Sequence, residues 1–414
     1  MDRTPHGEPA EPDVLAWLTR RISDYASREI SPETPLSECG LDSVAVLSLF
    51  GDIEEGFGSL IDPDDIWAYA SVRALAHHIT VCRSRLGDGG RIRPAFVFGG
   101  QGAQHPCMTA GLHRDSAVYR ACLTRADEAL RPYLGCSVAE VILSGGPDID
   151  RTALSHSAVF AVGYALAETL LDAGVRPVAV VGHGVGELTA AVTARALPLA
   201  EAAQLVALRG QFIQDLPDGG GMLAVCADPD EAADVIAGEP EVYIGAINAA
   251  RATVLSGRLD ALARVRDALS AAGLSSRFLS VGHAYHSPCM NPVAPRLRAL
   301  ARRFPGSPPA VAYYSPVYGR QWTERLGADY WAVQVTSPVR FAAAVRRMLS
   351  QDMPTHVVEI GPRPVLTPFV RRIDGAAGPR CLPVCRGPET DVVDLAGVLS
   401  ALDAGPLAED SMMW

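Results

Sequence analysis

This 414-residue sequence has few features of a secreted, metal-binding, membrane or nucleic-acid-binding protein. Its nine cysteines are odd in number and include no C-x-x-C pair, which argues against a disulfide framework and a zinc site. The formal net charge is -11 and the arginines are scattered, so a nucleic-acid partner is not expected. The longest apolar stretch, residues 158–171, is interrupted by Glu168, and the N-terminus has no apolar signal region. We therefore expect a cytoplasmic protein that binds neither metal nor membrane.

The chain is too long for one ordinary core, and 48% of its residues are hydrophobic, so we expect two or three folded domains. The composition changes at residues 83–93, where glycines lie among arginines with almost no apolar side chains, as is typical of a linker. Residues 1–12 are polar and include proline, so we expect a disordered N-terminus there. The break then predicts a first domain at 13–86, a linker at 87–93 and a second domain that starts at residue 94.

The first domain has the apolar spacing of a small all-α bundle. Asp13 is a candidate cap for a helix with apolar residues at helical spacing as far as Tyr25, and a second helix is expected to start near Asp42. The run Gly-Leu-Asp-Ser-Val at residues 40–44 places the hydroxyl of Ser43 at the start of this second helix. By itself, such a serine is explained as a helix cap.

Residues 13–82 resemble an acyl carrier protein of the polyketide synthase type. The similarity rests on Leu36, on the Gly-Leu-Asp-Ser run and on residues 61–79. It implies that Ser43, next to Asp42, carries 4'-phosphopantetheine, whose thiol holds acyl groups as thioesters, and that a phosphopantetheinyl transferase is a partner. The acidic residues beside Ser43 are then either a docking face for basic partner surfaces or an ordinary solvated face.

The second domain contains a strand, a sharp turn and a helix in the order that a nucleophile elbow requires. An apolar strand at residues 177–181 runs into Gly-His-Gly-Val-Gly at 182–186, which is the G-x-S-x-G elbow with Gly184 in the serine position. This context predicts a mostly parallel α/β sheet. Residues 221–280 show the pattern strand, helix, strand, strand, helix, strand, which predicts an inserted ferredoxin-like subdomain.

Residues 94–387 resemble the malonyl-CoA:ACP transacylase family, which includes the acyltransferase domains of polyketide synthases. The resemblance implies an α/β-hydrolase-like acyltransferase that follows the helical carrier bundle and ends at residue 387, with a post-acyltransferase tail at residues 388–414. The matching motifs are Phe98 to Gly102, Gly182 to Glu187, Arg209-Gly210, Asn248, His283 to Ser287, Ser337 to Phe341 and Glu359 to Pro362.

The resemblance also implies roles for individual residues. His286 matches the base, and Gln101 with the backbone N–H of Val185 matches the oxyanion donors. Arg209 matches the residue whose guanidinium fork binds a free carboxylate. The site wall is matched by His183, Tyr285 and Asn248. An aromatic ring beside the base crowds the space of an α-methyl group, so Tyr285 favours malonyl over methylmalonyl thioesters of CoA or a carrier protein.

The departures from the family pattern bear directly on function. Gly184 has no Oγ, so no acyl-enzyme forms at this position, while a glycine relieves the backbone strain of an elbow. Glycine replaces the usual proline at residue 99, His-Ser replaces Gln-Pro at 156–157, and Gln-Val-Thr replaces Asn-Leu-Arg at 334–336. A single engineered change would leave these other positions untouched, so their number favours natural divergence.

Three functions stay open, and they differ in what attacks the thioester. In the favoured one nothing attacks, and the acyltransferase half binds acyl groups, acyl-CoA, or carrier and synthase domains. In the second, the protein is a malonyl transferase with an engineered Ser-to-Gly change, or a bound thiol attacks directly with help from His286. In the third, His286 activates water and the protein is a thioester hydrolase.

Overall fold

The computed structural model describes residues 11–41, 43–57, 69–86, 92–374 and 378–405. Asp42, most of the predicted N-terminus and linker, and the end of the predicted tail lie outside these ranges. The chain divides into two compact units, one formed by residues 1–92 with 374–380 and the other by 93–373 with 381–414. Each unit has its own buried core, as expected for separate domains.

The first unit is helical, as the apolar spacing predicts. Its helices are α1 (Glu11–Ala26), α2 (Ser43–Phe57) and α3 (Val72–Leu86), with a short 3-10 helix at Leu36–Glu38. One buried face from each helix forms the core, which includes Leu18, Ile22, Leu49, Ile53, Leu75 and Ile79. The prediction that Asp13 caps the first helix was wrong, because α1 begins at Glu11 and Asp13 lies inside its first turn.

The second unit is built on a six-stranded sheet in the order β10-β9-β1-β2-β7-β8. The strands are β1 (Pro94–Phe98), β2 (Ala179–Gly182), β7 (Ala312–Ser315), β8 (Arg320–Trp322), β9 (His356–Ile360) and β10 (Arg380–Pro383). β1 pairs in parallel with β2 and β9, and β2 pairs in parallel with β7, whereas the β7–β8 pair is antiparallel. β1, β2 and β9 are buried throughout. Burial on both faces explains the continuous apolar sequences of β1 and β2, whereas β9 also buries His356 and Glu359.

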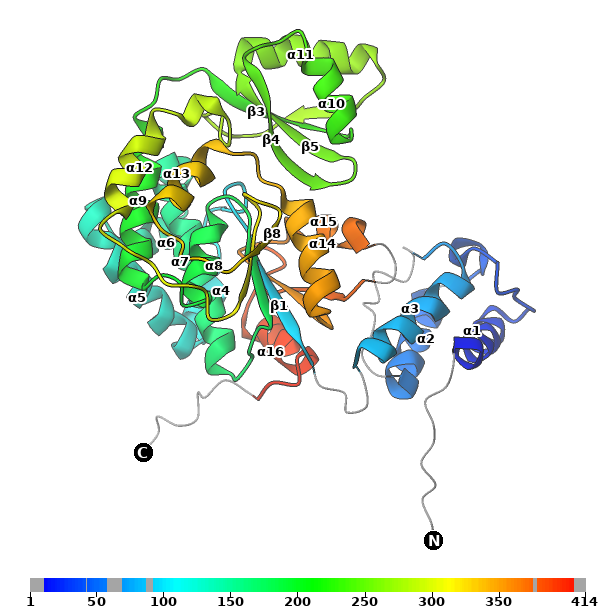
Figure 1. The fold of residues 1–414 in the computed structure, drawn as a ribbon. Helices are drawn as coiled ribbons and strands as arrows, with labels where there is room; N and C mark the ends of the chain where they lie inside the picture. Colours follow the sequence, from blue (N-terminus) through cyan, green and yellow to red (C-terminus); the bar gives the residue numbers. More distant parts are fainter. Residues whose placement is uncertain (1–10, 42, 58–68, 87–91, 375–377, 406–414) are drawn as a thin grey trace, which may run out of the picture. The chain divides into compact units, whose positions relative to one another are not determined.

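Helices cover both faces of this sheet. Figure 1 shows α8 (Gly186–Thr193) on one side of β1 and α14 (Phe341–Asp352) on the other. The central helix, α7 (Thr152–Asp172), is long and apolar enough to cross a membrane, but 89% of its apolar window is buried inside the protein, between α5 (Ala117–Leu134) and α9 (Leu199–Gln214). The remaining helices are α4 (Ala110–Asp115), α6 (Val138–Ser144), α12 (Val293–Ala301), α13 (Ala328–Thr336), α15 (Thr367–Asp374) and α16 (Val392–Ala401).

A second, four-stranded sheet is inserted between α9 and α12, at the top of Figure 1. Its elements follow the order β3 (Gly220–Val225), α10 (Pro229–Ile236), β4 (Val242–Ala249), β5 (Ala252–Arg258), α11 (Leu259–Ala271) and β6 (Ser276–Phe278). The strand order is β4-β5-β3-β6, and every neighbouring pair is antiparallel. Backbone hydrogen bonds between Val339 and β4, at 2.9 Å in each direction, tie this sheet to the loop before α14.

The segment expected to be a tail contributes a helix to the second unit. Asp391 caps α16 through a capping box with Asp394, and α16 packs against α4. The contact is close, because a Cβ on Gly111 would lie 2.7 Å from the carbonyl oxygen of Thr390. The described part of residues 388–414 is therefore an integral part of this unit.

Candidate active site

The elbow lies where β2 ends and α8 begins. The His183 N–H donates to the carbonyl of Phe98 at 2.9 Å, so the turn is held against the end of β1. A Cβ on Gly186 would lie 2.5 Å from the Phe98 carbonyl oxygen, so only glycine allows this approach. Gly184 itself has a φ of +56°, in the left-handed region that side-chain-bearing residues avoid.

His286 faces the position where an elbow side chain would be. A Cβ built on Gly184 would lie 3.2 Å from His286 Nε2. His286 Nδ1 lies 3.2 Å from the carbonyl oxygens of both Gln334 and Ser337, and only a protonated Nδ1 satisfies these acceptors. Nε2 therefore carries the lone pair. Burial, followed by the charge of Arg209, lowers the pKa of His286 to about 3, so the ring is neutral at pH 7.

Glu187, the last residue of the elbow motif, supports the elbow through its buried carboxyl group, a role that the sequence did not predict. The Gln334 amide donates to the carbonyl of Gly184 at 2.8 Å and to Glu187 Oε1 at 3.1 Å. The hydroxyls of Tyr330 and Tyr313 donate to Glu187 Oε2 at 2.5 and 3.1 Å. Burial raises the pKa of Glu187 to about 7 despite these hydrogen bonds. The available signal was an acidic residue in the otherwise apolar first turn of α8.

Arg209 is a buried cation without a carboxylate partner among the described residues. Its side chain is 4% exposed, and its Nη1 lies 3.1 Å from His156 Nδ1, while its Nε is buried with no hydrogen-bond partner in this part of the chain. Burial lowers the pKa of Arg209 to about 10, which leaves it charged at pH 7. Because an unpaired buried charge is unfavourable, this position is suited to receive an anion.

The other predicted residues line the same site. His156 Nε2 lies 3.0 Å from Gln101 Oε1, which joins the predicted oxyanion donor to Arg209. The Tyr285 hydroxyl is 2.9 Å from Thr152 Oγ1, and its ring centroid lies 5.8 Å from that of His156. His183 Nε2 and Asn248 Oδ1 lie 2.8 Å apart, and Val185 directly follows Gly184 at the start of α8.

Sequence comparisons match both units. The acyl transferase domain family matches residues 95–378, and the phosphopantetheine attachment site family matches residues 16–79. The chain belongs to the acyl transferase domain family. The second unit is therefore an acyltransferase domain, and the first is a phosphopantetheine carrier, as the sequence predicted.

The relatives are polyketide synthases. Polyketide synthase GfsB of Streptomyces halstedii is 35% identical over 73% of this chain and 5% of its own length. Spectinabilin polyketide synthase system protein NorA' of Streptomyces orinoci is 37% identical over 78% of this chain and 9% of its own length. The chain thus spans less than a tenth of these relatives.

Solved acyltransferases share the fold. A loading acyltransferase from the avermectin modular polyketide synthase has a TM-score of 0.70 and 33% identity, and covers 75% of this chain and 99% of its own. The acyltransferase domain from the second module of the salinomycin polyketide synthase has a TM-score of 0.72 and 29% identity, and covers 97% of this chain and 93% of its own.

The carrier unit matches the phosphopantetheine attachment site family, whose group is attached to a serine. Ser43, the predicted attachment residue, is the first residue of α2, and Gly40 has a φ of +74° with no atom within 4 Å of a Cβ built there. The first N–H groups of a helix point away from its end and favour a phosphate. When bound, the group would supply a thiol that holds an acyl thioester.

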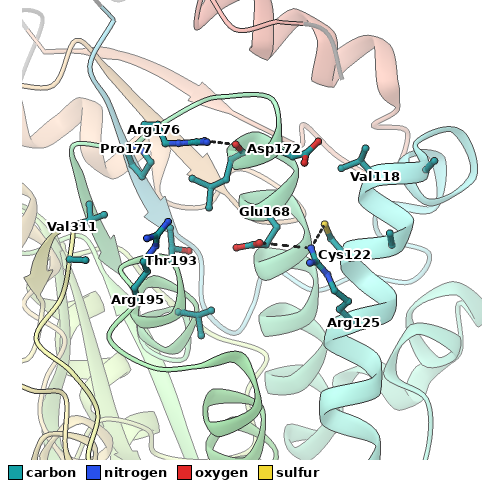
Figure 2. A pocket seen from close by; sticks show the side chains of 15 residues that line it. Val118, Cys122, Arg125, Glu168, Asp172, Arg176, Pro177, Thr193, Arg195 and Val311 are labelled. Atoms are coloured by element: carbon teal, nitrogen blue, oxygen red, sulfur yellow. Dashed lines mark hydrogen bonds and ion pairs between the residues drawn. The ribbon is translucent and has the colours of Figure 1, made fainter. Parts of the chain in front are cut away.

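The acyltransferase unit also has a pocket of about 960 Å³ that is separate from the elbow (Figure 2). It lies between α5 and the end of α7, and includes Pro177 and Val311, which precede β2 and β7. The elbow follows the opposite end of β2. Arg125, Cys122 and Glu168 all line this pocket. Arg125 Nη2 donates to Cys122 Sγ at 3.1 Å and lies 3.8 Å from Glu168 Oε2. This pocket therefore contributes nothing to the Gly184 site.

Proposed function

We propose that this carrier–acyltransferase didomain of polyketide biosynthesis binds malonyl-type thioesters in its acyltransferase unit without forming an acyl-enzyme. The observation that carries the proposal is the pairing of Gly184 with a correctly oriented His286. His286 Nε2 would lie 3.2 Å from a Cβ built on Gly184, but glycine has no side chain that could carry a nucleophile. In a protease with comparable acyl-transfer chemistry, loss of the serine lowers turnover by about 10⁶.

The binding groups support retention of a ligand. Arg209 is charged, buried and unpaired at its Nε among the described residues, so its guanidinium fork is available for the free carboxylate of a malonyl group. Gln101 and the Val185 N–H lie beside the elbow, where they would hold the thioester carbonyl oxygen. Tyr285 would restrict the space for an α-methyl group, and this makes malonyl the preferred acyl group.

The remaining assignments extend this proposal to the whole chain. Residues 13–86 would form the carrier, with Ser43 as the phosphopantetheine attachment site, and residues 94–387 the acyltransferase. Residues 221–280 would form a ferredoxin-like subdomain, supported by the strand order β4-β5-β3-β6. We infer a cytoplasmic location, with a phosphopantetheinyl transferase and other carrier-dependent domains of a polyketide synthase as partners.

The test uses full-length pantetheinylated protein, malonyl-CoA and two measurements. Calorimetry should detect binding of malonyl-CoA, and mass spectrometry should find no malonyl group on the protein unless an active transferase is added. Acetyl-CoA, which lacks the second carboxylate, is the matched ligand control. Rapid loading of the Ser43 arm without an added transferase would overturn the proposal.

The orientation of His286 favours one second candidate, direct transfer. In this reaction the His286 Nε2 lone pair accepts the proton of the carrier thiol, the sulfur forms a bond to the malonyl carbonyl carbon, and the bond to the CoA sulfur breaks. The proton then passes to the CoA thiolate, which balances the exchange. Loading of the Ser43 arm that disappears in His286→Ala would support this candidate. If water attacks instead, free malonate would accumulate.

A further inference from the structure

The pocket of about 960 Å³ in Figure 2 is separate from the Gly184 site and is large enough for a ligand of its own. Pockets that bind small organic molecules commonly measure about 300–1,000 Å³. Part of the wall is apolar, with side chains from α5, α7, α8 and the segments before β2 and β7: Val118, Leu171, Val192, Pro177 and Val311. This part of the pocket is suited to a hydrocarbon group.

The same pocket carries more positive than negative charge. Its lining includes three arginines, which are Arg125, Arg176 and Arg195, and two carboxylates, which are Glu168 and Asp172, so its formal net charge at pH 7 is +1. One negative charge on a ligand would balance this excess, whereas two would leave a negative excess. The charge of the pocket therefore favours a monoanion.

Two of the three arginines already have partners. Arg125 Nη2 contacts Cys122 Sγ and Glu168 Oε2, and burial raises the pKa of the Cys122 thiol, so this thiol is uncharged at pH 7. Arg176 Nη1 donates to two backbone carbonyls at and just beyond the end of α7. These contacts hold both guanidinium groups at the wall of the pocket.

Arg195 is the arginine of this pocket that is available to a ligand. Its side chain is exposed, and its guanidinium makes no hydrogen bond or ion pair within the described ranges of the chain. Figure 2 shows Arg195 on one side of the pocket and Arg125 on the other. A cation near the end of α8 is favoured by the helix dipole, but this guanidinium does not bond to the last carbonyls of α8 in the part of the chain that the structure describes.

The backbone at Arg195 is unusual for an arginine. Its φ is +57°, in the left-handed region, and it follows the C-cap of α8, where glycine is the usual residue. A side chain at such a position is strained, and strained residues cluster at binding sites. An unpaired guanidinium at the edge of a partly apolar pocket gives this residue a physical role.

We propose that this pocket binds an organic monocarboxylate with a hydrocarbon chain. Its carboxylate would receive two parallel hydrogen bonds from the guanidinium of Arg195, and its chain would pack against the apolar wall. The inference is independent of the proposed function, because none of the residues that line this pocket belongs to the Gly184 site.

The test measures binding of octanoate to the full-length protein by isothermal titration calorimetry. Octanoate should bind more tightly than hexanoate, by up to about fourfold for each additional buried methylene group. Octanamide has the same chain without the charge and should bind about tenfold more weakly or less. Octyl phosphate, with close to two negative charges, should bind no more tightly than octanoate.

Three substitutions locate the bound octanoate. Arg195→Gly removes the guanidinium and is compatible with a φ of +57°, so the protein should fold and its affinity should fall by about 10- to 100-fold. Arg195→Lys keeps the charge and should lose less affinity than the glycine variant. Ala121→Phe should abolish binding, because Ala121 lines the pocket and is exposed, so the new ring would fill the pocket and leave the core intact.

The matched control is Ala268→Phe, which places the same ring on an exposed position of α11, outside the pocket. It should bind octanoate like the original protein. No binding of octanoate, equal binding of octanamide, tighter binding of octyl phosphate, or unchanged affinity in Arg195→Gly would each overturn the inference. So would binding that is lost in Arg209→Met, because the probe would then occupy the Gly184 site.

The same proteins separate this inference from the proposed function. Malonyl-CoA should bind to Ala121→Phe as it binds to the original protein, since the pocket and the Gly184 site share no residue. If the original protein binds octanoate but not malonyl-CoA, the proposed function fails and this inference stands. If it binds malonyl-CoA but not octanoate, only this inference fails.

Discussion

Replacing Gly184 with serine tests whether the missing nucleophile is the one absent part of the acyl-transfer site. The new Cβ would lie 3.2 Å from His286 Nε2, which is a few tenths of an ångström closer than an ordinary contact. The hydroxyl would enter a site whose base is neutral and has its lone pair directed at the elbow. We therefore expect Gly184→Ser to acquire covalent labelling by malonyl-CoA.

The same substitution has a cost in stability that can be estimated. At a φ of +56°, a residue other than glycine is strained by about 1–3 kcal/mol. The loss of glycine's freedom in the unfolded chain offsets about 0.4–1 kcal/mol of this. A net loss of about 1–2 kcal/mol should lower the melting temperature by a few degrees. Gly184→Ala is the matched control, since it adds the same Cβ without a hydroxyl.

The assay is mass spectrometry of intact protein after brief exposure to malonyl-CoA, alongside thermal unfolding. Gly184→Ser should gain one malonyl group, with a rate increase of up to about 10⁶ over the original protein. Gly184→Ala should lose similar stability and gain no label. A Gly184→Ser protein that folds and binds malonyl-CoA but stays unlabelled would refute the reasoning, because the site would then be deficient beyond its nucleophile.

Four further substitutions test other parts of the structure. Arg209→Met should weaken malonyl-CoA binding by about 10- to 100-fold in calorimetry and leave acetyl-CoA binding unchanged, because only malonyl has a second carboxylate. Ser43→Ala should prevent phosphopantetheinylation, as read by mass spectrometry. Glu187 has a pKa raised from 4.5 to about 7, so the folded protein keeps a proton that the unfolded chain has released. As the pH rises from 4.5 to 7, the original protein should therefore lose stability relative to Glu187→Gln, by roughly 3 kcal/mol in denaturant unfolding. Gln334→Leu should lower stability by about 1–3 kcal/mol and reduce labelling in the Gly184→Ser background, because it removes the amide that holds the elbow.

Local sequence patterns predicted the elements whose contacts are also local. The short run of apolar and aromatic residues at 242–247 predicts a strand, and β4 runs over Val242–Ala249. The apolar sequence of residues 157–173 predicts a helix, and α7 begins five residues before this range, at Thr152. Its first turns contain Ser155, His156 and Ser157, which look like a loop because they are polar. All three are buried in the structure, and His156 is satisfied by residues distant in sequence, which no local pattern reveals.

In the candidate site, too, some features could be predicted from the sequence and others depend on contacts between residues that are distant along the chain. Gln101 and the Gly184 elbow follow β1 and β2, whose parallel pairing brings the carboxyl ends of the strands together. Arg209 in α9 and His286 in the loop before α12 reach the same region only after those elements have packed. The support beneath the elbow was not predicted. Glu187 receives hydrogen bonds from Tyr313 and Tyr330, which are 126 and 143 residues away along the chain. Nothing in the spacing of these tyrosines indicates a shared partner, because the contact exists only after β7 and α13 have packed.

The energetics of the site favour ligand binding over simple loss of function. A glycine at position 184 removes about 1–3 kcal/mol of elbow strain, which by itself is compatible with a site that is no longer used. Arg209 argues against that interpretation, since an unpaired buried charge has a desolvation penalty of several kcal/mol. Substitution of Arg209 by an apolar residue would remove this penalty, whereas a bound carboxylate would offset it. The retained charge therefore supports our proposal that the acyltransferase unit holds an anionic acyl group.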